Sequence, residues 1–267
     1  PLMDEKLVEE AMKKAKELDV PISLHEEDPA YIKQPGVNQG KVSEQLNYGG
    51  ASYLAEAVMV KRDCELAVKT GAKVDIQHIS SGVAVDYVKE AKEKGANVYA
   101  EASPHHFTLT EEAVLKYGTL ARMNPPLRTE EDRQRIIKGL QEGTIEIIAT
   151  DHAPHSKEEK DKPLDQAPSG ITGIETSLAL GVTELVEKGY LSMMQLLEKM
   201  TVNPAKLYNM EQGRLQEGKP ADVVLFDPEE EWEVKEYKSK ATNSPFTGWK
   251  LKGKVKYTIC DGKIIEL

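Results

Sequence analysis

The sequence has 267 residues, of which 39% are hydrophobic, 30% charged and 6% aromatic. This is ordinary globular composition for one large domain or two smaller ones, and it excludes a disordered chain, a collagen and a disulfide scaffold. The 35 Lys and Arg residues stand against 45 Asp and Glu residues, and the resulting net charge of -10 argues against nucleic acid or an anionic membrane as the main partner.

Helix and strand patterns alternate along the first part of the chain. Charged and apolar residues repeat at helical spacing over residues 4–18, with Leu7, Ala11, Ala15 and Leu18 on one apolar stripe. The buried strands that we expect cover residues 22–25, 74–78, 97–101 and 145–150. The further helices that we expect cover residues 43–70 (broken at Gly49–Gly50), 83–94, 110–117, 129–141, 174–187, 192–200 and 204–208. This alternation predicts a parallel sheet with helices outside it.

The pattern changes from Gly213 onward. Short β-rich runs at residues 222–226, 232–236, 255–259 and 263–265 are separated by Gly, Pro and Asp turns. We therefore predict two units, an α/β domain over residues 1–212 and a small β module over residues 213–267.

Cysteine usage and hydropathy predict a cytoplasmic protein. Cys64 and Cys260 lie far apart and form no Cys-x-x-Cys pair, so we expect reduced thiols. No apolar run approaches the ~18–20 residues that a membrane span requires, and the acidic start Pro1–Glu5 has no signal-peptide pattern.

All six histidines fall within the first 155 residues, at or just beyond the ends of predicted strands. They are His25, His78, His105, His106, His152 and His155. In parallel α/β folds the carboxyl ends of the strands are where ligands and catalytic groups gather. With Asp151 at the end of a strand, the pattern predicts a metal site of the kind that zinc prefers. A single strand-end histidine is more often structural, and Asp151 could instead cap a following turn.

The segment Asn124–Arg128 contains two consecutive prolines, which fix the backbone and remove two donors. Such a rigid loop could hold the Asn124 amide against a substrate. Ordinary turn chemistry would produce the same pattern.

Five ordered segments resemble the bacterial class I dihydroorotases, cyclic amidohydrolases of the amidohydrolase superfamily. These segments are Leu24–Asp28, Gln77–Ser81, Pro104–Phe107, Asn124–Arg128 and Thr150–His155. The segment Gly213–Asp227 resembles the β module of the same superfamily. The resemblance implies the C-terminal half of a (β/α)8 TIM-type metallo-hydrolase barrel over residues 1–212, with part of a small β-sandwich module after it.

The resemblance also assigns roles to individual residues. His25 and His78 match histidines that bind zinc, and Asp151 matches an aspartate that binds a second zinc and moves a proton. Asn124 and His155 match residues that hold the substrate, and Ser169–Gly170 match a stretch that contacts it through the backbone. His105, His106 and His152 match positions that we expect to shape the loops.

The activity implied by the resemblance is the reversible hydrolysis of L-dihydroorotate to N-carbamoyl-L-aspartate by a zinc-activated hydroxide, with Asp151 as acid and base and two zinc ions in a complete site. This reaction belongs to pyrimidine biosynthesis. Two alternatives remain open: an allantoinase or hydantoinase acting on a different ring, and a non-catalytic subunit that scaffolds aspartate transcarbamoylase. A homodimer is also expected as a possible assembly.

Two features of the family pattern are missing from the sequence. The chain has no His-x-His pair, and only four strands precede the β module, whereas a closed barrel takes ~250 residues or more. We therefore expect a C-terminal part that lacks about 150 residues and has little or no activity alone.

Overall fold

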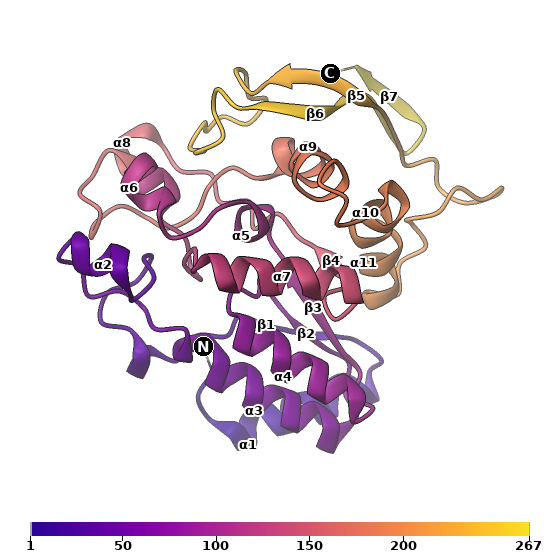
Figure 1. Ribbon diagram of the computed structural model, residues 1–267. Helices are drawn as coiled ribbons and strands as arrows, with labels where there is room; N and C mark the ends of the chain where they lie inside the picture. Colours follow the sequence, from indigo (N-terminus) through magenta and orange to yellow (C-terminus); the bar gives the residue numbers. More distant parts are fainter. Residues whose placement is uncertain (1, 267) are drawn as a thin grey trace.

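The computed structural model describes residues 2–266 and has an α/β fold around four short parallel strands (Figure 1). The strands are β1 (Ile22–Leu24), β2 (Val74–Ile76), β3 (Val98–Ala102) and β4 (Ile147–Ile148). They pair in chain order, with Ile22 opposite Val74, Val74 opposite Val98, and Ala102 opposite Ile148. The predicted parallel sheet is confirmed. Within residues 2–266 the four strands do not close into a barrel.

Helices connect the strands and cover the sheet. Those between the first and last parallel strands, together with the helix before β1, are α1 (Glu5–Glu17), α2 (Lys41–Gln45), α3 (Leu54–Thr70), α4 (Gly82–Glu93), α5 (Pro104–Thr108), α6 (Ala113–Tyr117) and α7 (Glu130–Glu142), with 3-10 turns at Pro29–Tyr31 and Gly118–Ala121. After β4 come α8 (Lys157–Lys160), a 3-10 turn at Ile174–Thr176, α9 (Ser177–Gly181), a π-helical turn at Val182–Val186, α10 (Met193–Met200) and α11 (Val202–Leu207).

The face that the first helix buries shares only Ala15 with the predicted stripe. Val8, Met12 and Ala15 are buried, whereas Leu7 and Leu18 are 48% and 61% exposed. Both stripes have helical spacing, but they lie on adjacent faces of the helix. The packing of α1 against α3 selects the face that carries Met12, because the Thr70 hydroxyl of α3 lies 3.9 Å from the Met12 sulfur.

The helix predicted over residues 43–70 is two helices, α2 and α3. Gly50 separates them at φ 69°, and a Cβ there would lie 2.7 Å from the Gln39 Cα. The position therefore requires glycine on both conformational and steric grounds. Gly71 ends α3 in the left-handed conformation.

Three further segments differ from their predicted forms. No helix is predicted where α5 and α8 form, and the helix expected over residues 174–187 is built from 3-10, α and π turns. The helix predicted over residues 129–141 is confirmed as α7, and the Thr129 hydroxyl caps it by accepting a hydrogen bond from the Asp132 backbone N–H.

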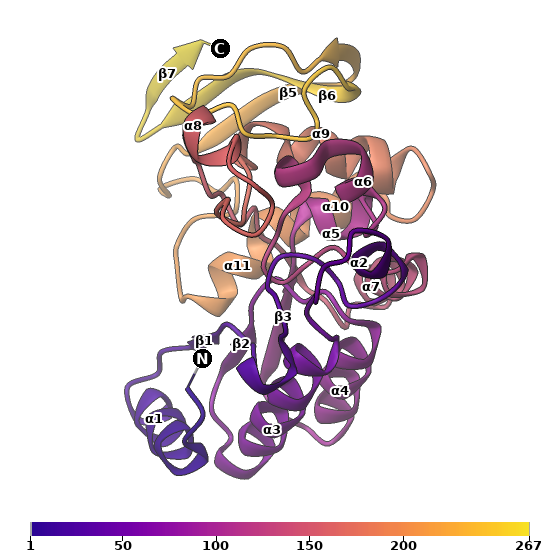
Figure 2. The same cartoon turned by 90° about the vertical axis from the view of Figure 1, so that its left-hand side faces the viewer.

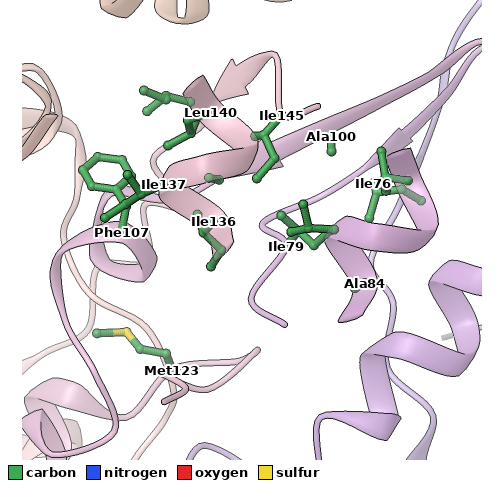
Figure 3. Packing of buried hydrophobic residues seen from close by; sticks show 14 of the residues in the cluster. Ile76, Ile79, Ala84, Ala100, Phe107, Met123, Ile136, Ile137, Leu140 and Ile145 are labelled. Carbon is green, nitrogen blue, oxygen red and sulfur yellow. The ribbon is translucent and has the colours of Figure 1, made fainter. Parts of the chain in front are cut away.

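The hydrophobic core lies between the parallel sheet and its helices (Figure 3). Ile136, Ile137 and Leu140 of α7 are each 1% exposed, and Ile76 of β2 and Phe107 of α5 are fully buried. Burying a large apolar side chain stabilises a fold by about 1.5–3 kcal/mol. This core fixes the strands whose carboxyl ends carry the candidate site.

An antiparallel sheet of three strands follows, in the order β5 (Val223–Glu233), β6 (Lys250–Cys260) and β7 (Lys263–Glu266). Figures 1 and 2 show it at the end of the molecule away from α1 and α3, above α9. The runs predicted at 222–226 and 232–236 form one strand, which ends at Glu233. Its pairing with β6 has two register shifts, between Leu225 and Phe226 and between Asp227 and Glu231. In the described part of the chain, no helix is both long and apolar enough to cross a membrane.

Candidate active site

The candidate metal ligands lie just past the carboxyl ends of the parallel strands. His25 follows β1, His78 follows β2, and Asp151 follows β4. His78 and Asp151 have left-handed backbones, with φ of 32° and 47°. Non-glycine residues rarely adopt this conformation, and it concentrates at functional sites.

His25 and His78 face each other. Nδ1 of His25 lies 2.9 Å from Nε2 of His78, and the two rings are nearly perpendicular. Burial and, second to it, the neighbouring His25 lower the pKa of His78 to about 4. The His78 imidazole is therefore neutral near pH 7, which is the form that binds metal. Its Nδ1 is buried and has no hydrogen-bond partner among the described residues.

Asp151 is the candidate acid and base of the site. Burial raises the pKa of its carboxyl group, and the electrostatic attraction of His25 opposes that rise. This attraction means that Asp151 lies within electrostatic reach of His25. A carboxylate with a raised pKa accepts a proton more readily than an exposed one.

The donor set suits zinc, which binds imidazole nitrogen and carboxylate oxygen. Within residues 2–266, however, no three His, Cys, Asp or Glu side chains lie close enough to hold a metal ion by themselves. His25 and His78 therefore fit as part of a metal site, with the buried, unpartnered Nδ1 of His78 available for a further interaction.

The four predicted substrate residues come together in a second group. Nε2 of His155 donates to the Ser169 carbonyl oxygen at 2.9 Å, and the Ser169 hydroxyl lies 3.4 Å from Oδ1 of Asn124. Gly170 has φ 105°, and a Cβ there would lie 2.5 Å from the Cβ of Ala153. Glycine is required where these two loops meet.

The remaining histidines contact the loops. His106 is buried, and its Nε2 donates to the Pro125 carbonyl oxygen at 3.0 Å, so the proton lies on that nitrogen. His152 Nδ1 accepts from the backbone N–H of Gly173 at 3.1 Å. Both contacts join the histidines to backbone groups of neighbouring loops, and the loop-shaping roles of both residues stay predictions.

Sequence reasoning missed Lys160, which lies under the loop that carries Ser169 and Gly170. Its ammonium donates to the carbonyl oxygens of Pro168 at 2.9 Å and Gly170 at 3.1 Å, and the residue is 4% exposed. The Gly170 N–H in turn donates to the Arg122 carbonyl oxygen at 2.8 Å. A lysine within a charged loop carries no sequence signal that separates it from its solvated neighbours.

The burial of Lys160 leads to a testable pH dependence of stability. Desolvation, followed by repulsion from Arg122, lowers the pKa of Lys160 to about 8 from an ordinary 10.5. The unfolded chain therefore binds more protons than the folded one between these values, so the folded state gains stability as the pH rises through 8 toward 10. Relative to Lys160→Met, we expect wild type to gain on the order of 2 kcal/mol between pH 7 and pH 10.

Urea denaturation at several pH values measures this difference. Lys157→Met is the matched control, because the Lys157 side chain on the same helix is 80% exposed. The difference in free energy of unfolding between Lys157→Met and wild type should not show the pH dependence expected for Lys160→Met. A Lys160→Met difference that stays constant with pH would show that the ammonium is not desolvated.

The fold and the site together define an α/β protein with polar groups at the carboxyl ends of parallel strands, the usual place for an active site. A family model described as "Amidohydrolase family" matches residues 3–265. The chain belongs to the amidohydrolase family.

Curated relatives of the chain are named dihydroorotase. The chain is 68% identical over 265 residues to the one from Clostridioides difficile (strain 630), covering 99% of this chain and 63% of the relative. It is 54% identical to the dihydroorotase of Clostridium acetobutylicum and 53% identical to that of Lactococcus lactis subsp. lactis, with the same two coverages. The chain thus spans about 63% of the length of these relatives.

Similar solved structures are hydantoinases. The L-hydantoinase (dihydropyrimidinase) from Arthrobacter aurescens matches with a TM-score of 0.86 at 25% identity, covering 100% of this chain and 61% of that chain. The dihydropyrimidinase from Brevibacillus agri NCHU1002 matches with a TM-score of 0.84 at 25% identity, covering 98% and 60%. These similarities confirm the predicted α/β class with its additional β sheet.

Proposed function

We propose that the protein to which this chain belongs is a dihydroorotase, which interconverts L-dihydroorotate and N-carbamoyl-L-aspartate. The observation that carries the proposal is 68% identity to a dihydroorotase over 99% of this chain. The meeting of Asn124, His155 and Ser169 in one loop cluster supports it, because these residues match the substrate positions of that family.

In the hydrolytic direction, Asp151 takes the proton of the attacking water and delivers it to the ring nitrogen that leaves. Its raised pKa suits both halves of this transfer. Asn124 and His155 hold the substrate, and the backbone at Ser169–Gly170 contacts its ring. The rigid loops around Gly170 and Pro125 keep these groups in one place.

We propose that His25 and His78 help to hold zinc. Zinc, when bound, polarises a carbonyl group and lowers the pKa of water toward ~7. The two imidazoles contribute neutral nitrogen donors, and Asp151 lies within electrostatic reach of His25. Two zinc ions in the complete site remain part of the proposal.

The test is a substrate panel on the protein expressed from its complete gene, with L-dihydroorotate, hydantoin, dihydrouracil and allantoin. We expect turnover of L-dihydroorotate, loss of that turnover after chelation, and recovery on adding zinc. Turnover of hydantoin or dihydrouracil in place of dihydroorotate would overturn the assignment. Recovery with no added metal would overturn the zinc proposal alone.

A hydantoinase is the second candidate, favoured by the solved structures at 25% identity. It is weaker than the first because the dihydroorotases are 50–68% identical to the chain. A complete lack of turnover with bound zinc would instead favour the non-catalytic subunit. The boundary at residues 212–213, the homodimer and a partnership with aspartate transcarbamoylase remain predictions.

A further inference from the structure

Asn243 lies in the segment between β5 and β6, far along the chain from the predicted site residues. It is 5% exposed, whereas its neighbour Thr242 is exposed. The segment is also fixed nearby, because the Glu175 carboxylate accepts from the backbone N–H groups of Lys238 and Ser239 at 2.8 and 2.9 Å. Asn243 therefore lies beside the candidate site on a segment whose backbone is held in place by hydrogen bonds.

The side-chain amide of Asn243 joins the two loops that carry the substrate residues. Its Nδ2 donates to the carbonyl oxygens of Ala153 at 3.0 Å and Gly170 at 3.2 Å, and its Oδ1 accepts from the His155 backbone N–H at 3.0 Å. An amide has two donor hydrogens, and both are used here. The Asn243 carbonyl oxygen also accepts from the Thr172 N–H at 3.0 Å.

The geometry points to Asn243 as a positioning residue, and we propose that it fixes His155 and the Gly170 peptide in the arrangement that receives the substrate. This inference rests on the proposed function, because that function makes His155 and Gly170 substrate contacts. Asn243 acts through these two groups. A loop displaced by a fraction of an ångström would weaken substrate binding while leaving Asp151 in place.

Residue-resolved hydrogen exchange tests the positioning directly. In Asn243→Ala the His155 N–H loses its acceptor, and the Gly170 loop loses a donor to its carbonyl oxygen while the Gly170 N–H keeps its bond to the Arg122 carbonyl oxygen. We expect both amides to exchange at least about tenfold faster, His155 directly and Gly170 because its loop opens more often. Amides of α4 should keep their wild-type rates, and Thr242→Ala should leave all rates unchanged. Wild-type rates at His155 and Gly170 in Asn243→Ala, or equal acceleration across the whole chain, would overturn the proposal.

Asn243→Asp separates the two contacts and guards against simple misfolding. The aspartate keeps an acceptor for the His155 N–H but loses both donors, and its second oxygen faces two carbonyl oxygens. We expect His155 to stay protected while the Gly170 amide exchanges faster. Equal loss of protection at both amides would contradict the assigned contacts.

A kinetic cycle then tests whether Asn243 acts through His155. We expect Asn243→Ala to raise KM for L-dihydroorotate about tenfold with kcat nearly unchanged, and the double variant with His155→Ala to lose less than the sum of the two single losses, because only the part that acts through Gly170 is left to lose. Additive losses would overturn this coupling. If wild type does not turn over dihydroorotate, the proposed function fails, whereas the exchange measurements still decide whether Asn243 fixes the loops.

Discussion

Asp151→Asn is expected to lower kcat for L-dihydroorotate by about 10²–10⁴-fold, the usual contribution of a positioned acid or base. Asparagine keeps the size of the side chain but cannot accept the proton. Because burial already disfavours the Asp151 charge, neutralising it should not destabilise the fold. Steady-state kinetics with L-dihydroorotate, together with thermal unfolding of both proteins, measures the two effects.

The matched control is Asp161→Asn, whose side chain is 60% exposed and pairs with Lys157 at the surface. We expect wild-type kinetics for this variant. Turnover by Asp151→Asn above about a tenth of the wild-type rate would exclude Asp151 as the general base, since such a base contributes at least ~10²-fold. An unfolded Asp151→Asn protein would contradict the second half of the prediction.

The strand ends were the most predictable part of the site. His25, His78 and Asp151 each follow a short strand of the parallel sheet, and parallel strands bring their carboxyl ends to one edge of the sheet. A sequence pattern is sufficient to predict that residues at strand ends share one edge of the sheet, because the order and direction of the strands alone decide it. The same pattern could not give the contact between His25 and His78, which depends on the pairing register and on side-chain rotation.

Asn243 and Lys160 could not be predicted, for two different reasons. Asn243 is joined to His155 by a long-range contact that no local periodicity encodes. Lys160 lies among exposed charged residues, and only the folded loop shows that its ammonium is buried. The buried face of α1 was predicted wrongly for a third reason. The helix has two apolar stripes, and only packing against α3 selects the one that carries Met12.

A buried polar network holds the loop after β2 against the loop that carries Asn124. Glu56 accepts from the backbone N–H groups of Ser80 and Ser81 at 3.0 and 2.9 Å, and it also accepts from the Ser80 hydroxyl. Nε of Arg128 donates to that hydroxyl at 3.1 Å. Glu56 and Arg128 are 3% and 4% exposed, so each charge depends on the other for compensation.

Arg128 has further partners that define its place in the network. Its Nη1 donates to Oδ1 of Asn38 and to the Ala51 carbonyl oxygen, both at 2.8 Å. Nδ2 of Asn38 donates to the Glu111 carboxylate at 2.7 Å. One guanidinium thus connects two buried carboxylates, which makes its removal costly.

Arg128→Met is expected to lower the free energy of unfolding by about 3–5 kcal/mol, because it leaves a buried carboxylate without its cation. Burial already raises the pKa of Glu56 and Arg128 opposes that rise, so in the variant the pKa rises further. A carboxyl group whose pKa is higher in the folded protein than in the unfolded chain destabilises the fold at pH values above its pKa in the unfolded chain. Protonation of the carboxyl group relieves this penalty as the pH falls. The loss measured by urea denaturation should therefore be smaller at pH 5 than at pH 8.

Adding Glu56→Gln separates the charge effect from lost packing. In Arg128→Met the added change should restore part of the lost stability, because it removes the uncompensated charge while keeping an acceptor for the Ser80 and Ser81 N–H groups. Exactly additive losses in the double variant would mean that the two charges do not depend on each other. Partial recovery, with a pH dependence reduced toward that of wild type, would assign the effect to Glu56 rather than to the volume of the arginine side chain.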